Sequence, residues 1–480
     1  MTPVENAVGL PAPFWFIELF KILGFLLHSI PMHIWLVGLP LAVMLLLIGG
    51  QNAKRFSRRL FKQFPIVIAL GINFGIVPLL FVQTAYYKAF YPSTILMAIH
   101  WMAILLLVMI AYYLLYSCSF LIENPSKRWT LILGTVASCC FIACGLIFSS
   151  AWTLMASPSD WGDIWEKTSI GGAVTGLGTY WDNPLVYYRF GSVIGLAFLT
   201  MAFWVAFDSV VLCKKLPPLI HSIPTRRSRK SNETTSNKDN LSAKNSEQLS
   251  SAVKTESTSK DSSLAKMSKK EKRRALKNGT ISKEEYDAIS SDQTDEVDFQ
   301  NSNSHSVSKS KNPGTLESYR NWTLSLASCL AWIGMLIAAP TLYFYFEQTI
   351  PAQSSLTESL GDHLFYRVIG NSWILLQWGT LSSLLLPAFL LLIGKRFFYR
   401  GFLVFCLLIS ELIILTFFAT IRQIIQNYQL IDYWNVAQLD SPSSVQWNPL
   451  ICFLSVLVFG LLVIFWMIRQ MVVASRTPKS

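Results

Sequence analysis

Long apolar stretches alternate with short polar connections along most of this 480-residue chain. Crossing a hydrocarbon core of ~30 Å takes ~20 residues of helix. Because lipid offers no water to bond the backbone, each stretch is expected to be helical. The sequence therefore predicts an all-α polytopic membrane protein with about nine transmembrane helices. The stretches are residues 21–49, 65–87, 93–117, 129–152, 190–213, 322–346, 368–393, 402–421 and 447–468.

Lysine and arginine gather in every second connection between these stretches. Cytoplasmic connections are the ones enriched in basic residues. The N-terminus is therefore predicted to lie outside and the C-terminus in the cytoplasm. The basic connections are 54–62, 127–128, the segment after Lys214, 395–400 and the tail from Arg469, whereas 88–92, 153–189, 347–366 and 422–446 are poorer in these residues.

Composition narrows the class of protein further. Apolar residues make up 52% of the chain and charged residues only 14%, far from the average of soluble proteins. The net charge of +12 lies mostly in the predicted cytoplasmic connections, so no nucleic-acid partner is expected. The eight cysteines form neither a C-x-x-C pair nor a C-x-x-C-H haem attachment. Cys139, Cys140 and Cys144 cluster, which favours helix packing over a metal or redox site.

The charge and composition divide the chain into three parts. Residues 1–215 hold the first five helices, with an outer cap at 153–189 that carries several tryptophans. Residues 216–320 are basic and rich in Ser, Lys and Asn, so most of this cytoplasmic insertion is predicted to be disordered. Within it, 267–289 has the pattern of a helical hairpin. Residues 321–480 hold the last four helices.

Histidines within the membrane are the first candidates for chemistry, because polar side chains are costly there and usually functional. His28 and His100 lie in different stretches, each roughly 10–12 Å below the outer surface if 1.5 Å per residue is counted from Lys21 and from Pro92. Two imidazoles at one depth are what a b-type haem in a bundle requires. His33 points away from the face of His28. A hydrogen-bonded packing role is the alternative for each.

Charged residues near the same surface extend this hypothesis. Arg189, Arg367 and Arg422 stand at outer helix ends, where they could pair with the two propionates of a haem. Contact with lipid phosphate is the alternative. Glu411, in the middle of 402–421, is interpreted as the only acid deep in the bilayer. It is either a neutral hydrogen-bond donor or part of a proton or ligand site.

At these residues the chain resembles subunit I of the cytochrome bd quinol oxidases, a nine-helix family with its N-terminus outside. FLLHSIPMHIWLVGLPLAVMLLLI places His28 at that family's axial histidine for a high-spin haem. LGINFGIVPLLF is similar to its G-x-N-F-x-x-G stretch, and FSSAWTLMASP to its tryptophan followed by a proline. In MAIHWMAILL, His100 stands where the family has a glutamate. Asn183–Pro184 and TIRQ, with Arg422, also match.

The chain also departs from that family. The ligands of its low-spin haem appear here as Ser192 and Ile369, and a further glutamate ligand appears as Ala419. The loop 347–366 is too short for the family's quinol-binding loop. The resemblance therefore implies a divergent relative that is not a conventional quinol oxidase. If it catalyses a reaction, the reaction is an oxidoreduction of cytochrome bd type.

The sequence thus predicts a haem-b-binding subunit of a respiratory electron-transfer complex in the inner membrane of a bacterium. His28 is the expected axial ligand of the haem iron and His100 a candidate second ligand, with Arg189, Arg367 and Arg422 near the propionates. Its partners would be other subunits of a membrane redox complex, with a periplasmic cytochrome c as one candidate. Two alternatives stay open. One is a haem-free anchor for periplasmic redox subunits, and the other, less favoured because no internal repeat is seen, is a transporter.

Overall fold

The computed structural model confirms the predicted fold class. Within the part of the chain it describes, the structure is all-helical, and nine helices are long and apolar enough to cross a bilayer. The hairpin predicted at 267–289 and most of the 216–320 insertion lie outside that part. The predicted orientation of the termini stays a prediction. The described residues are 9–122, 127–217, 315–349, 373–397, 399–436 and 445–476.

The long helices account for eight continuous spans and one span built from two shorter helices. The latter are α16 (Trp373–Ser383) and α17 (Leu385–Phe397), which are separated by a break at Leu384. The continuous spans are α1 (Phe14–Ile48), α2 (Gln51–Ala85), α4 (Ala98–Leu121), α5 (Lys127–Met155), α7 (Pro184–Phe207), α13 (Leu316–Thr349), α18 (Arg400–Gln429) and α19 (Trp447–Arg476). A π-helical turn, η2 (Asp208–Leu212), extends α7.

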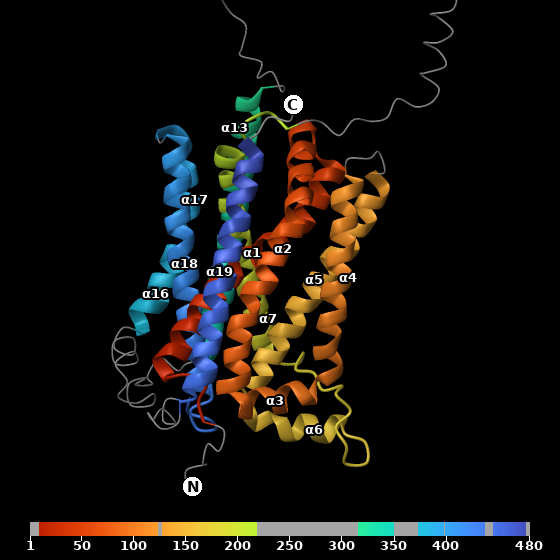
Figure 1. The fold of residues 1–480 in the computed structure, drawn as a ribbon, viewed down its shortest axis with the longest axis vertical. Coiled ribbons are helices and arrows are strands. Elements are labelled where there is room, and N and C mark those ends of the chain that lie inside the picture. The colour runs from red at the N-terminus through yellow and green to blue at the C-terminus, as the bar shows by residue number, and fades with distance from the viewer. Residues whose placement is uncertain are drawn as a thin grey trace, which may run out of the picture. The chain divides into compact units, whose positions relative to one another are not determined.

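Two short helices, α3 (Tyr87–Leu96) and α6 (Trp161–Thr168), lie across one end of the bundle, near the N-terminus (Figure 1). We name this the capped end; topology predicts that it faces outward. The segment after α6 bonds to the start of α4. The Ile99 amide donates to the Gly176 carbonyl (3.1 Å), and the Gly178 amide donates to the Leu96 carbonyl (2.9 Å). The outer cap is therefore joined to the helix ends by backbone hydrogen bonds.

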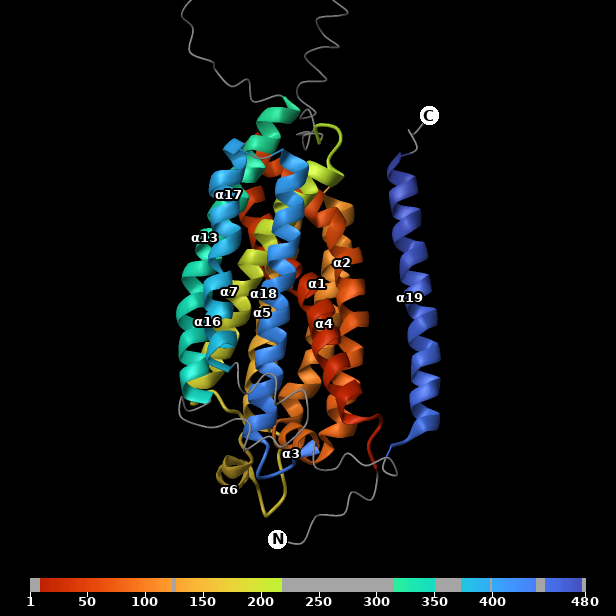
Figure 2. The same cartoon turned by 90° about the vertical axis from the view of Figure 1, so that its left-hand side faces the viewer.

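Helix α1 is the centre of the bundle. It packs against α2, α5, α7 and α18, and 67% of its most apolar stretch is buried. Helix α19 is the opposite case, because only 6% of its stretch is buried and it runs beside the other helices (Figure 2). Among its described side chains, Phe453 reaches the rings of Phe20 and Phe81. Four polar side chains of α1 are therefore buried in the bundle, those of Glu18, Lys21, Ser29 and His33.

Close contact between α7 and α13 depends on small residues. A Cβ added to Gly195 would lie 2.5 Å from the Ala338 backbone nitrogen, and one added to Gly334 would lie 2.8 Å from the Gly195 carbonyl oxygen. Small residues let helix backbones approach closely in membranes, where van der Waals packing drives association. This contact holds the second half of the bundle against the first.

Gly195→Ala is expected to destabilise the bundle by about 1–3 kcal/mol, the usual cost of forcing a methyl group into a packed contact. Reversible unfolding in mixed detergent micelles measures this change. Gly460→Ala in α19 is the matched control, because no atom lies within 4 Å of the added Cβ. Equal stabilities of the two variants would contradict this account of the contact.

Three helix boundaries differ from the predictions. Helix α1 begins at Phe14 and not near Lys21, so Glu18 and Lys21 lie inside a spanning helix. The basic connection 54–62 forms the first turns of α2, where long basic side chains can reach the interface. The third stretch was predicted to begin near Pro92, but the chain breaks at Met97 (φ −113°, ψ 34°). Its first residues form α3, and the spanning helix α4 starts at Ala98.

Candidate functional site

His28 lies on α1 with one ring nitrogen bound to protein. Its Nδ1 atom is 2.8 Å from the carbonyl oxygen of Gly71 on α2. A carbonyl only accepts hydrogen bonds, so Nδ1 carries the ring proton and Nε2 keeps its lone pair. Among the described residues Nε2 has no hydrogen-bond partner. Histidines that bind metals usually donate their other N–H to a carbonyl or carboxylate in this way.

Two glycines of the LGINFGIVPLLF stretch make this position possible. A Cβ on Gly71 would lie 2.2 Å from the Trp35 ring, and a Cβ on Gly75 would lie 2.8 Å from Nδ1 of His28. These glycines are four residues apart and therefore share one face of α2. Their missing side chains let α1 approach α2 and leave room for the imidazole. The glycines of this motif thus have a structural reason in this chain.

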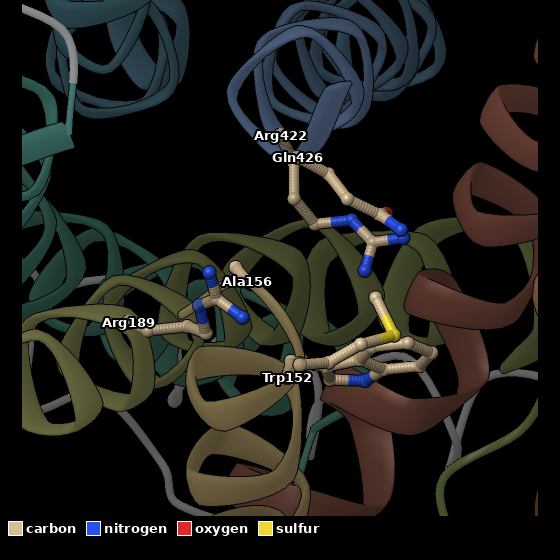
Figure 3. A pocket seen from close by; sticks show the side chains of 6 residues that line it. Trp152, Ala156, Arg189, Arg422 and Gln426 are labelled. Carbon is tan, nitrogen blue, oxygen red and sulfur yellow. The ribbon is translucent and has the colours of Figure 1, made fainter. Parts of the chain in front are cut away.

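Arg189 and Arg422 enter one pocket at the capped end, from α7 and α18 respectively (Figure 3). The Arg422 guanidinium carbon lies 3.9 Å from the ring centroid of Phe25, one turn of α1 before His28, and 5.9 Å from that of Trp152. An Arg189 Nη2 donates to the Tyr345 hydroxyl (3.0 Å). The Nε atoms of both arginines are buried without a hydrogen-bond partner.

The space between Arg189, Arg422 and their neighbours is small. Its volume is about 10 Å³, which is room for about one water molecule and far below the ~300–1,000 Å³ of sites that hold a whole drug-sized ligand. Within the described part of the chain neither arginine is paired with a carboxylate. Two partly buried cations side by side repel each other, and an anion between them would relieve that cost.

A buried carboxylate next to this pocket was missed by the sequence analysis. Glu18 is 1% exposed, so Glu411 is not the only acid within the membrane-spanning helices. Gln423 Nε2 and Asn427 Nδ2, both on α18, donate to its two oxygens (2.9 Å each), and the Tyr86 hydroxyl adds a third bond (3.0 Å). The Nζ of Lys21 lies 3.7 Å from the centroid of the Tyr86 ring.

The charges in this region do not balance. Glu18 interacts electrostatically with Lys21, and Lys21 and Arg189 each interact with Arg422. In the described residues these interactions link three cations to one carboxylate, and only Lys21 acts on that carboxylate directly. The Nζ of Lys21 is also buried without a hydrogen-bond acceptor. Glu18 is the countercharge of Lys21, so Arg189 and Arg422 are left without one among the described residues, which favours an acidic ligand beside them.

His33 and Glu411 belong to a different place, deeper in the bundle. His33 is directed to α7, where its Nδ1 lies 2.8 Å from Oγ1 of Thr200, and that hydroxyl also bonds to Oε1 of Glu411 on α18. His28, in contrast, is directed to α2. This agrees with the prediction that the two histidines of α1 point apart. Among the described residues, Glu411 therefore has a hydrogen-bonded partner and no charged one.

The two remaining candidates are not brought to His28. His100 lies in the first turn of α4, which packs on α5, α2 and α3, and its Nδ1 is buried without a partner. His28 and His100 were predicted to lie at equal depth because His100 was counted as eight residues into its helix, from Pro92. The helix starts instead at Ala98, only two residues before His100. The count therefore no longer supports two imidazoles at one depth. Its role as a second ligand stays a prediction. Arg367 lies outside the described residues.

A buried ion pair between α2 and the end of α7 centres on Asp208. At the end of α7 its carboxylate accepts from Nε and Nη2 of Arg59 on α2 (2.8 and 2.7 Å) and from Nε2 of Gln63 (2.6 Å). Its side chain is fully buried. Since this pair lies at the end of the bundle away from the cap, it fixes α2 to α7 there.

Comparison with known proteins adds no name to this site. No protein-family model matches the chain, and no curated protein matches it. Among the described residues no three His, Cys, Asp or Glu side chains are grouped as a metal site would require. A haem iron is different, because the porphyrin supplies four ligands and the protein needs to add only one or two. His28 is the candidate for that role.

Proposed function

We propose that the protein is a haem-b-binding subunit of a membrane electron-transfer complex, as the resemblance to cytochrome bd subunit I implies. The observation that carries this proposal is the Nε2 of His28, which has no hydrogen-bond partner among the described residues. Arg422 lies nearby, over the ring of Phe25, one turn of α1 before His28. An oriented imidazole thus lies close to arginines that have no carboxylate partner in the described part of the chain. When bound, a haem b would supply one-electron transfer at its iron.

Each residue of the site has a part in holding such a group. The Gly71 carbonyl fixes the tautomer and direction of the His28 ring. Arg189 and Arg422 offer paired donors to carboxylates, and such charge-assisted bonds are strong when partly shielded from water. The pocket is too small to admit the acidic groups as it stands, so a haem would have to separate the packed side chains between α1, α5 and α18. A ligand that binds only the folded chain stabilises it, so haem binding should raise the melting temperature.

The test of this proposal is the haem content of the purified chain. We expect b-type bands in reduced-minus-oxidised spectra and in a pyridine haemochrome assay, with at least one haem per chain. The protein should be purified together with its native neighbours, because the proposed complex includes other redox subunits. Well-folded protein without haem under these conditions would reject the proposal and favour the haem-free anchor.

Arg422→Gln is expected to weaken haem retention by roughly 10- to 100-fold, the equivalent of one charged hydrogen bond of about 1.5–3 kcal/mol. Reduction adds negative charge, so losing a nearby cation should also lower the reduction potential. Haem content after dialysis against apomyoglobin and a redox titration measure the two effects. Arg400→Gln, at the exposed start of α18, should change neither. An Arg422→Gln variant identical to wild type would place the propionates elsewhere.

A further inference from the structure

A hydrogen-bonded chain crosses three helices in the centre of the bundle. It links His33 on α1, Thr200 on α7 and Glu411 on α18, and their exposed fractions are 0%, 0% and 2%. The proposed haem site does not use these residues. Polar side chains enclosed this completely by apolar helices are costly, which makes a purely structural role expensive.

The hydroxyl of Thr200 lies between an acid and a base, and it is also 3.1 Å from the Leu196 carbonyl of its own helix. It can donate one hydrogen bond and accept two, so its proton is directed to one of these acceptors at a time. When Glu411 is protonated it can donate to Thr200, which then donates to Nδ1 of His33. If both protons shift along these bonds, Glu411 becomes a carboxylate and His33 an imidazolium, and Thr200 is again a neutral hydroxyl. One proton has then moved from α18 to α1 with no other change.

The chain is also open at both ends. Nε2 of His33 and Oε2 of Glu411 are buried and have no hydrogen-bond partner among the described residues. Buried polar atoms are normally satisfied, so each end calls for a small hydrogen-bonding molecule such as water or hydronium. A network that served only packing would be closed by protein groups at its ends. These two atoms are where a proton would enter and leave.

No fixed charge holds the proton at one end. In the described part of the chain, the ionisable group that acts on His33 is His28, on the same helix, and the side chain that acts on Glu411 is that of Thr200. Neither His33 nor Glu411 forms an ion pair with another described residue. A salt-bridged acid would stay ionised, whereas this carboxyl can take up and release a proton.

We propose that His33, Thr200 and Glu411 form a proton relay through the centre of the bundle. Its function is to carry a proton between two buried water sites, one beside Glu411 and one beside His33. The relay is independent of the proposed haem, although it ends five residues along α1 from His28. If a haem is present there, the relay would bring protons close to an electron-transfer group.

Hydrogen–deuterium exchange at constant pH tests the relay without any haem. The carboxyl band of Glu411 is followed by infrared spectroscopy and assigned by its loss in Glu411→Gln. The ring N–H of His33 is followed by ¹⁵N NMR of histidine-labelled protein and assigned by His33→Gln. If the hydrogen bonds connect the two groups, deuterium that enters at either end reaches both of them. The Glu411 carboxyl and the His33 ring N–H of the wild-type protein should therefore exchange at the same rate.

Thr200→Val should separate the two rates by about tenfold or more, because losing the hydroxyl removes the connecting hydrogen bonds. Thr200→Ser keeps the hydroxyl and should keep the common rate. Thr380→Val is the matched control, since Thr380 is equally buried but donates only to the Leu376 carbonyl of its own helix. Two different rates in wild type, or a common rate that survives Thr200→Val, would overturn the relay. Because haem content is measured separately, failure of the relay and failure of the proposed function are distinguishable.

Discussion

Replacing His28 with alanine is expected to remove nearly all b-type haem absorbance from the purified chain. His28 offers the free Nε2 next to the arginine pocket, and its Nδ1 is already committed to Gly71. Changing even the outer partner of a metal ligand typically costs 10–100-fold in affinity, so losing the ligand itself should cost at least about this much. The measurement is haem per chain, by pyridine haemochrome, in protein whose folding is checked by gel filtration.

Two further variants make this result specific. Gly75→Ala retains His28 but places a methyl group 2.8 Å from its Nδ1, so it should shift the haem spectrum or reduce haem content. His100→Ala should leave the haem spectrum and the haem content unchanged if His28 is the single protein ligand. A shifted spectrum in His100→Ala would identify it as the second ligand predicted from the sequence. Full haem content with a wild-type spectrum in His28→Ala would contradict the assignment of His28.

Asp208→Asn is expected to destabilise the protein by about 3 kcal/mol or more, the largest effect on folding among the described ion pairs. The substitution keeps the size of the side chain but leaves the Arg59 guanidinium, about a quarter exposed, without its countercharge. Removing one partner of a buried pair typically costs about 3–5 kcal/mol, and arginine cannot avoid the cost by losing its proton. Unfolding in mixed micelles measures this loss.

The matched control is an ion pair on the surface. Arg400 bonds to Glu317 at 3.3 Å, and the Glu317 side chain is 75% exposed. Because solvent screens such a pair, Glu317→Gln should change stability by less than about 1 kcal/mol. Similar losses in Asp208→Asn and Glu317→Gln would show that the Arg59 pair does not hold α2 to α7.

The sequence predicted the helices well because hydropathy is a local property. Each span needs only about 20 apolar residues, and the chain contains nine such stretches. The boundary of α1 was wrong because its first charges were interpreted as the end of the span. Glu18 is tolerated inside because its hydrogen-bond donors, Tyr86, Gln423 and Asn427, are 68, 405 and 409 residues away in the sequence. Nothing in a local window indicates those partners.

The candidate site was predicted in part for the same reason. Arg189 and Arg422 were predicted to lie near one membrane surface because each stands at the outer end of its helix. The structure does bring them into one pocket. The partners of His33 and Asp208 are different, because Thr200 is 167 residues from His33, and Arg59 is 149 residues from Asp208. Such pairings depend on which helices touch. A single sequence without related sequences does not reveal which helices are neighbours.

The central place of α1 also has a consequence for how the protein is made. His28 is synthesised early, whereas Arg422 and Glu411 are carried by α18, which comes almost 400 residues later. At translation rates of 5–20 residues per second, the ribosome needs roughly 20–80 s to bridge that interval. Until α18 has entered the membrane, Glu18 lacks two of its three donors and Thr200 lacks its acid. The polar contacts that α18 makes with the earlier helices can therefore form only after the C-terminal half has been inserted.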